Sequence, residues 1–303
     1  MEFGKLSDIS SVDFRLRAEP PENERILGGS GLCNFYIGCT GWSMKEWVGK
    51  VYPIGAKTKD YLHHYSRQFN TIEFNTTHYR IPDFGTVERW YAESAADFRF
   101  CPKIPQTISH SQDLGASSGQ VFEFAEAIGG LKEKIGCCFM QLPEHFGPER
   151  WRLLDEFLER FPANLPLAVE VRHPGWFKPE GESILFPLLE GHGKAAVITD
   201  VAGRRDVAHM RLSAPLTMVR FVGNGLHPSD FTRIDEWVER LKTWAEQGIR
   251  EIIFFAHEPD NLLAPELSVY LLEKVQARIA AHVRGPQLLS APEIPGKQLG
   301  LFE

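Results

Sequence analysis

The sequence lacks the long apolar runs and the excess of basic residues that mark several classes of protein. No apolar run approaches the roughly 18 to 20 residues that a membrane span requires. Residues 1–10 have neither the basic nor the apolar region of a signal peptide. Lys and Arg number 33 against 40 Asp and Glu, a formal charge of -7, and such a chain does not coat nucleic acid through its overall field. We therefore expect a cytoplasmic protein without a membrane partner, in which any contact with phosphate depends on a local group of Lys and Arg.

Cysteine is scarce, and the five residues do not form a recognisable site. Four of them, Cys39, Cys101, Cys137 and Cys138, lie in apolar runs typical of strands, without the spacing of zinc ligands. We expect buried, reduced thiols. A glycine-rich phosphate fingerprint is also missing after the first apolar run. Its absence argues against an open, doubly wound, dinucleotide-binding sheet, which is the main rival architecture.

The sequence does contain a regular alternation of short apolar runs and stretches with helical spacing. Of its 303 residues 43% are apolar, enough for a sizeable core. The runs lie at residues 34–42, 71–77, 98–105, 135–143, 166–176, 194–201, 217–224 and 251–258. Eight such runs in roughly 250 residues predict an α/β fold, a single (β/α)8 TIM-type barrel. Because the stretch after Asp200 lacks helical spacing, we expect the barrel to be irregular after its sixth strand.

These patterns divide the chain into three parts. Residues 1–33 lack periodicity and are expected to form an N-terminal extension with little structure of its own. Residues 34–284 are expected to form the barrel domain, whose last helix is predicted near residues 265–284. Residues 285–303 are interrupted by prolines and predict an extended tail.

Polar side chains stand where almost every predicted strand ends. In a barrel of this type the active site is built at the carboxyl ends of the strands, so these side chains are expected to meet in one pocket. The candidates for catalysis are Glu73, Glu170, His173 and Asp200. The candidates for substrate binding are Thr40, Trp42, Asn75, Lys103, Gln141, Arg172, Trp176, Arg220 and His257.

The residue types in this set indicate a pocket for an anion. Carboxylates serve as general acid or base, and Lys103, Arg172 and Arg220 suit phosphate or carboxylate. Trp42 and Trp176 could stack on a sugar or a base. His173, His257 and the carboxylates are residue types that bind a divalent metal ion, but three cations in one pocket argue against one; the sequence leaves the cofactor unknown. The alternative is that the charges close structural ion pairs and the indoles only pack.

Three segments carry a family resemblance. They are residues 37–43, IGCTGWS, together with Trp47; residues 69–80, FNTIEFNTTHYR; and residues 170–176, EVRHPGW. In combination they resemble the YecE-like family, catalogued as domain of unknown function seventy-two, over about residues 34–282. The resemblance implies a TIM-barrel fold and no established activity. Many members end the last strand with Phe-Asn-Asn, whereas this chain has Ala256-His257-Glu258, which leaves the role of the eighth strand end open.

The last six residues resemble the short peptide by which bacterial replication and repair proteins bind the DNA sliding clamp. In that peptide a glutamine and a terminal Leu-Phe pair fill a surface pocket, which implies partner binding by Gln298, Leu299, Leu301 and Phe302. Apolar anchors on an extended tail fit such docking. Gly300 departs from the Ser or Asp common in the peptide. The alternative is that these side chains pack back on the barrel.

The sequence leaves three hypotheses for function. The first is an enzyme on a phosphate-containing substrate, such as a phosphodiesterase or endonuclease acting on DNA and recruited by the clamp. The second is an enzyme on a small phosphorylated or carboxylated sugar-like metabolite. The third is a non-catalytic binding module whose charges form closed ion pairs.

Overall fold

A parallel sheet forms the centre of the computed structural model, which describes residues 3–289. All eight predicted runs are strands, rich in Val, Ile and Phe because both faces of each strand are buried. They are β1 (Cys33–Gly38), β2 (Thr71–Phe74), β3 (Arg99–Pro102), β4 (Cys138–Gln141), β5 (Leu167–Glu170), β6 (Ala195–Asp200), β7 (Leu216–Val222) and β8 (Glu251–His257). The strand order β4-β5-β6-β7-β8-β1, with β2-β3 beside it, follows the chain around a ring.

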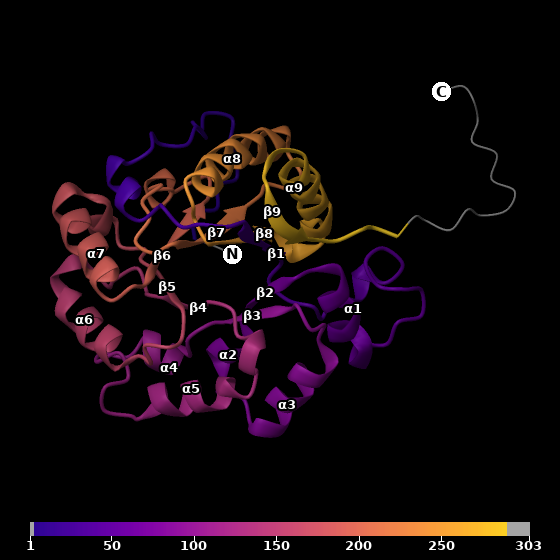
Figure 1. Ribbon diagram of the computed structural model, residues 1–303, viewed down its shortest axis with the longest axis horizontal. Helices are drawn as coiled ribbons and strands as arrows, with labels where there is room; N and C mark the ends of the chain where they lie inside the picture. The colour runs from indigo at the N-terminus through magenta and orange to yellow at the C-terminus, as the bar shows by residue number, and fades with distance from the viewer. Residues whose placement is uncertain (1–2, 290–303) are drawn as a thin grey trace, which may run out of the picture.

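Helices surround this ring of strands (Figure 1). The longer ones are α1 (Tyr61–Gln68), α3 (Phe84–Glu93), α5 (Gln120–Gly129), α6 (Trp151–Arg160), α7 (Pro179–Gly191), α8 (Pro228–Glu246) and α9 (Ala264–Arg278), and the short ones are α2 (Thr76–Tyr79) and α4 (Gln106–Ser109). Only a 3-10 turn, Arg205–Val207, lies between β6 and β7. The architecture is therefore a TIM-like barrel with the predicted irregularity after β6. Within residues 3–289 no helix combines the length and apolar character that crossing a membrane requires.

Regular strand pairing is interrupted between β1 and β2 and between β3 and β4. Side-chain and backbone hydrogen bonds connect the strands at these two places. Between β1 and β2, the Asn70 side chain accepts from Ile37 N at 2.7 Å and donates to Phe35 O at 2.9 Å. A Cβ at Gly38 would lie 2.4 Å from Thr71 O, so this close approach requires glycine. Between β3 and β4, Ile104 N donates to Phe139 O at 2.9 Å.

A ninth strand was not predicted. β9 (Ala281–Arg284) pairs in parallel with β1, so the predicted helix over 265–284 is wrong at its end, since α9 stops at Arg278. Beyond it the chain is extended at Ile279, and Val283 packs on the apolar cluster beneath α8 and α9. The free edge of β1 and this apolar contact favour a strand over further helix.

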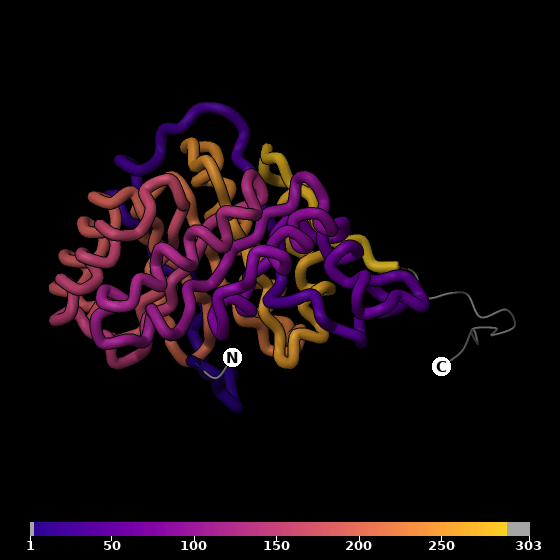
Figure 2. Tube along the Cα trace, turned by 90° about the horizontal axis from the view of Figure 1, so that it is seen from below, coloured from indigo at the N-terminus to yellow at the C-terminus, as the bar shows by residue number. Residues whose placement is uncertain are grey.

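The N-terminal arm, residues 3–32, has one 3-10 turn, Pro21–Arg25, and otherwise runs along the barrel surface. At the strand-end mouth Phe3 packs on Val201 and Val207 and is only 8% exposed. Near the opposite end Asn23 donates to Met210 O at 2.9 Å. The indigo trace of the arm accordingly appears at both ends of the molecule in Figure 2. The arm has little regular structure, as predicted, but it is an integral part of the mouth.

The core beneath the mouth is apolar. One cluster inside the ring includes Phe139, Met218 and Phe255. All five cysteines are free and buried, as predicted, and burial raises the pKa of Cys39 and of Cys101 to about 12. These thiols therefore belong to the core and stay protonated near neutral pH.

Candidate functional site

Arg220 of β7 joins two carboxylates inside the strand-end mouth. Its Nε and Nη2 donate to the two carboxylate oxygens of Glu73 at 2.8 and 2.9 Å, and its Nη1 donates to Glu170 Oε2 at 2.6 Å. All three side chains are buried. The guanidinium lies 5.6 Å from the centre of the Phe139 ring, directly on the apolar core. Glu73, Glu170 and Arg220, which lie at or near the carboxyl ends of β2, β5 and β7, thus meet at one point.

The ion pairs keep both carboxylates charged. Burial opposes ionisation of Glu73, but Arg220 and then His257 outweigh it and hold the pKa of that carboxyl well below its usual value. Burial likewise opposes ionisation of Glu170, and Arg220 and Arg172 outweigh it and lower its pKa. Both groups are therefore anions near pH 7.

Three more predicted residues extend the group toward β3, β4 and the end of β5. Arg172 Nε donates to Glu170 Oε1 at 2.9 Å, and Arg172 Nη2 donates to Gln141 Oε1 at 2.9 Å. Lys103 Nζ donates to the same Gln141 oxygen at 3.1 Å. Burial, followed by repulsion from Arg220, lowers the pKa of Lys103 to about 8. We call these residues with His257 the strand-end cluster: Glu73, Lys103, Gln141, Glu170, Arg172, Arg220 and His257.

His257 closes the cluster from the end of β8. Its Nε2 lies 2.8 Å from Glu73 Oε2. Because an ionised carboxylate only accepts hydrogen bonds, Nε2 carries the proton, and Nδ1 then has a lone pair. Burial lowers the pKa of His257, and its contact with Glu73 offsets only part of this effect. The ring is therefore neutral near pH 7, oriented by a carboxylate as in a catalytic base.

A cavity of about 630 Å³ lies beside His257, over the ends of β7 and β8; we call it the β7–β8 cavity. The N-terminal arm forms one wall, through residues 4–7 and Ile9, and the loops after β6, β7 and β8 form the others. From the predicted set, Thr40 and His257 line it. The volume is that of a site for a small molecule.

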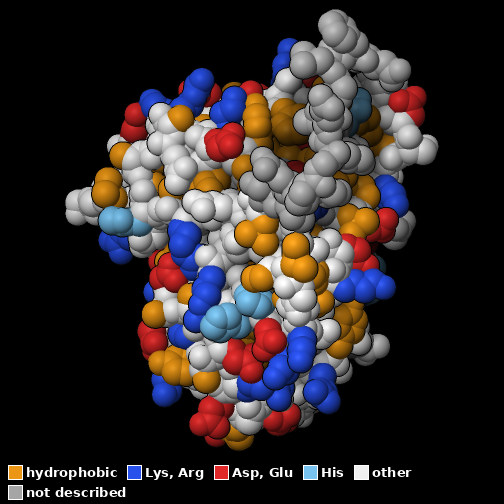
Figure 3. Space-filling model, turned by 90° about the vertical axis from the view of Figure 1, so that its right-hand side faces the viewer, with side chains coloured by type: hydrophobic (Ala, Val, Ile, Leu, Met, Phe, Trp, Pro, Cys, Tyr) orange, Lys and Arg blue, Asp and Glu red, His pale blue; other side chains and the backbone are white. Residues whose placement is uncertain are grey.

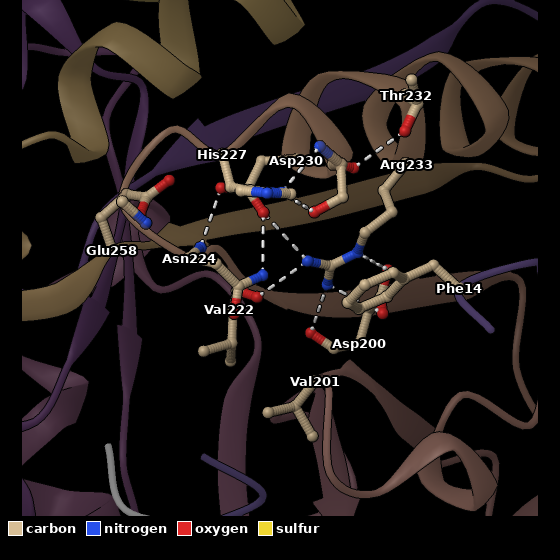
Figure 4. A network of polar contacts seen from close by, with 12 residues as sticks. Phe14, Asp200, Val201, Val222, Asn224, His227, Asp230, Thr232, Arg233 and Glu258 are labelled. Carbon is tan, nitrogen blue, oxygen red and sulfur yellow. Dashed lines mark hydrogen bonds and ion pairs between the residues drawn. The ribbon is translucent and has the colours of Figure 1, made fainter. Parts of the chain in front are cut away.

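Asp200 does not join the cluster, so its prediction as a catalytic residue is corrected. It is fully buried and accepts from Trp237 Nε1 at 2.7 Å, and Arg233 Nη2 lies 2.9 Å from its Oδ1. Figure 4 shows this network, in which Arg233 of α8 also reaches Asp230. The side chain thus faces α8, outside the ring, and ties that helix to β6.

Three aromatic candidates also lie elsewhere. Trp176 is 0% exposed, with its Nε1 donating to Phe146 O at 2.7 Å, so it has no face for a substrate. Trp42 stacks on Phe74 at 5.0 Å between ring centres and packs among other aromatic rings. His173 caps the turn after β5, where its Nδ1 accepts from Gly175 N at 3.0 Å. Both indoles pack outside the strand-end cluster, and Trp42, which is partly exposed, borders a separate cavity near α1 and α3.

The remaining candidate, Asn75, supports the cluster indirectly. Its Nδ2 donates to Glu73 Oε1 at 3.0 Å, which places it as a neighbour of the carboxylate. Within residues 3–289 no group of three or more His, Cys, Asp or Glu side chains is arranged to hold a metal ion.

Sequence reasoning missed the residues that line the cavity beyond the strand ends. These include Glu258, Asn261 and the arm from Gly4 to Ser7. The available signal was the polar run after β8, Glu258 to Asn261, which directly follows the strand-end His257. No comparable signal marks the arm, because its place at the mouth depends on tertiary packing alone.

On the face of the molecule around α1, basic and acidic side chains are interspersed (Figure 3).

The predicted partner-binding residues Gln298, Leu299, Leu301 and Phe302 lie outside the residues that the structure describes.

Comparisons with known proteins agree on one group of relatives. The model of the family described as "Protein of unknown function DUF72" matches residues 36–291. The UPF0759 protein YecE of Escherichia coli K12 is 34% identical over 286 residues, covering 88% of this chain and 99% of the relative. A solved DUF72 family protein from Enterococcus faecalis has a TM-score of 0.64 at 19% identity, covering 80% of this chain and 95% of that one. Another from Thermotoga maritima has a TM-score of 0.61 at 21% identity, covering 80% and 98%.

Proposed function

Because the chain belongs to the DUF72 family, whose function is unknown, we propose its function from its own geometry: it is an enzyme that moves a proton on a small anionic substrate. The substrate class is a phosphorylated or carboxylated sugar-like metabolite. One observation carries the proposal, which is that Glu73 fixes one nitrogen of His257 while the imidazole lines a cavity of about 630 Å³.

In this proposal His257 is the general base. Glu73 accepts the Nε2 proton and leaves the Nδ1 lone pair to take a proton from the substrate. Arg220 keeps Glu73 ionised, so the carboxylate stabilises the imidazolium that forms. A positioned base of this kind typically contributes a rate factor of about 10² to 10⁴.

The charge of the cluster supports an anionic substrate. Two carboxylates, Glu73 and Glu170, face two guanidinium groups and the Lys103 ammonium, which leaves one positive charge when Lys103 is protonated. In a buried setting one uncompensated cation attracts an anion more strongly than it does in water. Lys103 is therefore the residue that anchors the anionic group.

The test is binding of sulfate, an anion whose charge does not change between pH 6 and 10. We expect Lys103→Met to remove sulfate binding, measured by calorimetry. Lys194→Met is the matched control, since Lys194 is also buried but donates to Leu165 O, before β5 begins. In the wild type, affinity is greatest below pH 8 and falls as the pH rises through about 8, where Lys103 loses its proton. Equal binding by Lys103→Met, or affinity independent of pH, contradicts the proposal.

A DNA phosphodiesterase recruited to the sliding clamp is the second candidate. Only the tail sequence, Gln298 to Phe302, favours it. The limited volume of the cavity, about 630 Å³, and the interspersed charges around α1 favour a small molecule instead.

A further inference from the structure

Two buried acceptor atoms in the β7–β8 cavity have no hydrogen-bond donor among the described residues. They are Glu258 Oε1 and Asn261 Oδ1, and both side chains line the cavity. Glu258 is only 7% exposed. A buried acceptor without a donor costs free energy, so such atoms are rarely left unpaired in a folded protein. Because both side chains line one cavity, a ligand that donates hydrogen bonds there is a candidate partner for them.

The Glu258 carboxylate is held in place. Its Oε2 accepts from Gly225 N at 2.7 Å, and a Cβ at Gly223 would lie 2.2 Å from Oε1, so the oxygen occupies the space above that glycine. The loop that carries both glycines is itself fixed, because Asn224 N donates to Asp230 Oδ2 at 2.8 Å within the network of Figure 4. The acceptor is therefore preorganised.

The rest of the lining combines charges of both signs with apolar surface. The arm contributes the cation Lys5, Asp260 contributes a carboxylate, and His257 of the strand-end cluster lines the same cavity. Leu6, Val222 and Pro259 add apolar surface. Hydroxyl groups on an apolar ring face match this mixture of charged, polar and apolar surface.

We propose that the β7–β8 cavity binds the polyhydroxyl part of the substrate, whose hydroxyl groups donate to Glu258 Oε1 and Asn261 Oδ1. The inference deepens the proposed function and rests on it for the position of the anionic group. It makes Glu258 and Asn261 residues that determine specificity. The sugar-like portion lies over β7 and β8, next to His257, while the anion lies toward Lys103.

The decisive variant is Glu258→Gln. Gly225 N requires an acceptor, so the amide oxygen takes the place of Oε2 and the amide nitrogen takes the place of Oε1. A donor then stands where the ligand needs an acceptor. The matched control is Glu266→Gln. Glu266 Oε2 is also buried without a donor, but this side chain lies outside the cavity, and its other carboxylate oxygen, Oε1, pairs with Lys50. Asn261→Ala tests the second acceptor independently.

Calorimetry with glucose 6-phosphate, ribose 5-phosphate and inorganic phosphate provides the readout. We expect at least one sugar phosphate to bind the wild type at least tenfold more tightly than inorganic phosphate does. Glu258→Gln and Asn261→Ala should remove this advantage without changing phosphate affinity, and Glu266→Gln should retain it. Burial raises the pKa of Glu258 to about 7, so part of this carboxyl group is protonated at pH 7. Because hydroxyl donors favour its ionised form, binding at pH 7 should release protons in the wild type but not in Glu258→Gln.

The outcomes separate the two proposals. If inorganic phosphate binds through Lys103 but the sugar phosphates gain nothing, or Glu258→Gln leaves their advantage intact, the cavity inference fails and the proposed function stands. If no phosphate binds but free glucose or ribose binds in a manner that depends on Glu258, the cavity inference stands and the anion site fails. Tighter binding of glucosamine than of glucose, or no binding of any of these probes, overturns the inference.

Discussion

At the scale of single residues, Arg220 determines whether the mouth of the barrel is stable. It is fully buried and satisfies one carboxylate from β2 and one from β5. Without it, Glu73 would keep only neutral close partners such as His257, and Glu170 would keep only Arg172 as a close cation, so the buried carboxylates would be costly to keep ionised. The same contact that orients Glu73 for His257 thus also stabilises the fold.

We predict that Arg220→Met lowers the free energy of unfolding by about 3 to 5 kcal/mol at pH 7, as measured by urea denaturation, because one partner of a buried ion pair is lost. The control is Arg25→Met, since Arg25 forms a half-exposed pair with Glu190 and should change stability by less than about 1 kcal/mol.

The difference in unfolding free energy between the wild type and Arg220→Met should depend on pH. In the wild type the lowered pKa values of Glu73 and Glu170 add stability that is present above their unfolded pKa, near 4.3, and is lost as the pH falls below it. In Arg220→Met, Glu73 has lost its guanidinium partner and Glu170 keeps only Arg172, so protonation by acid relieves the buried carboxylates. The gap between the two proteins should therefore narrow from pH 7 to pH 4, and a constant gap would show that the pair does not control stability.

At the scale of elements, the N-terminal arm carries part of the site. Its first described residue, Phe3, packs on Val201 and Val207, and its ring lies 4.3 Å from the Arg172 guanidinium. Because the following residues form a wall of the β7–β8 cavity, the arm must stay docked for that wall to exist.

We predict that Phe3→Ala increases trypsin cleavage after Lys5 by at least tenfold. Burying a Phe side chain contributes roughly 2 kcal/mol, which corresponds to more than tenfold in the population of the opened arm. The rate is measured by mass spectrometry of limited digests. Leu6→Ala is the control, since Leu6 is already 43% exposed; equal cleavage of the two variants would mean that Phe3 does not anchor the arm.

The sequence predicts the elements better than it predicts the direction of single side chains. All eight strands follow from apolar runs and turn residues, because a parallel strand buried on both faces is apolar throughout. The same property hides which side chains point inward, so Asp200 and Glu170 look alike in sequence although one faces α8 and the other faces the cluster. β9 was not predicted, because its pairing with β1 depends on a free edge of β1 that exists only in the folded barrel.

At the scale of the whole molecule, the barrel and the tail are separate proposals. The strand-end cluster lies within the described residues 3–289, whereas residues 290–303 lie outside them. Recruitment by a sliding clamp would rest on Gln298, Leu299, Leu301 and Phe302.

We predict that the intact protein binds a bacterial sliding clamp and that removal of residues 298–303 abolishes the binding, measured by surface plasmon resonance. Two apolar anchors in one pocket provide most of the affinity of such a peptide. The control replaces Gln287, which is exposed and lies before the peptide. Equal binding with and without the six residues would contradict recruitment through the tail. The proposed anion site would be unaffected.

The proposed proton transfer depends most on the protonation state of His257, and nitrogen NMR of the imidazole in the intact protein measures that state directly. We predict that at pH 7 the ring is neutral, with the proton on Nε2 and a lone pair on Nδ1, and that its pKa lies below 6.5 because of burial. Glu73→Gln should lower that pKa further, since the carboxylate raises it. A charged ring at pH 7, or a proton on Nδ1, would contradict the assignment of His257 as the base.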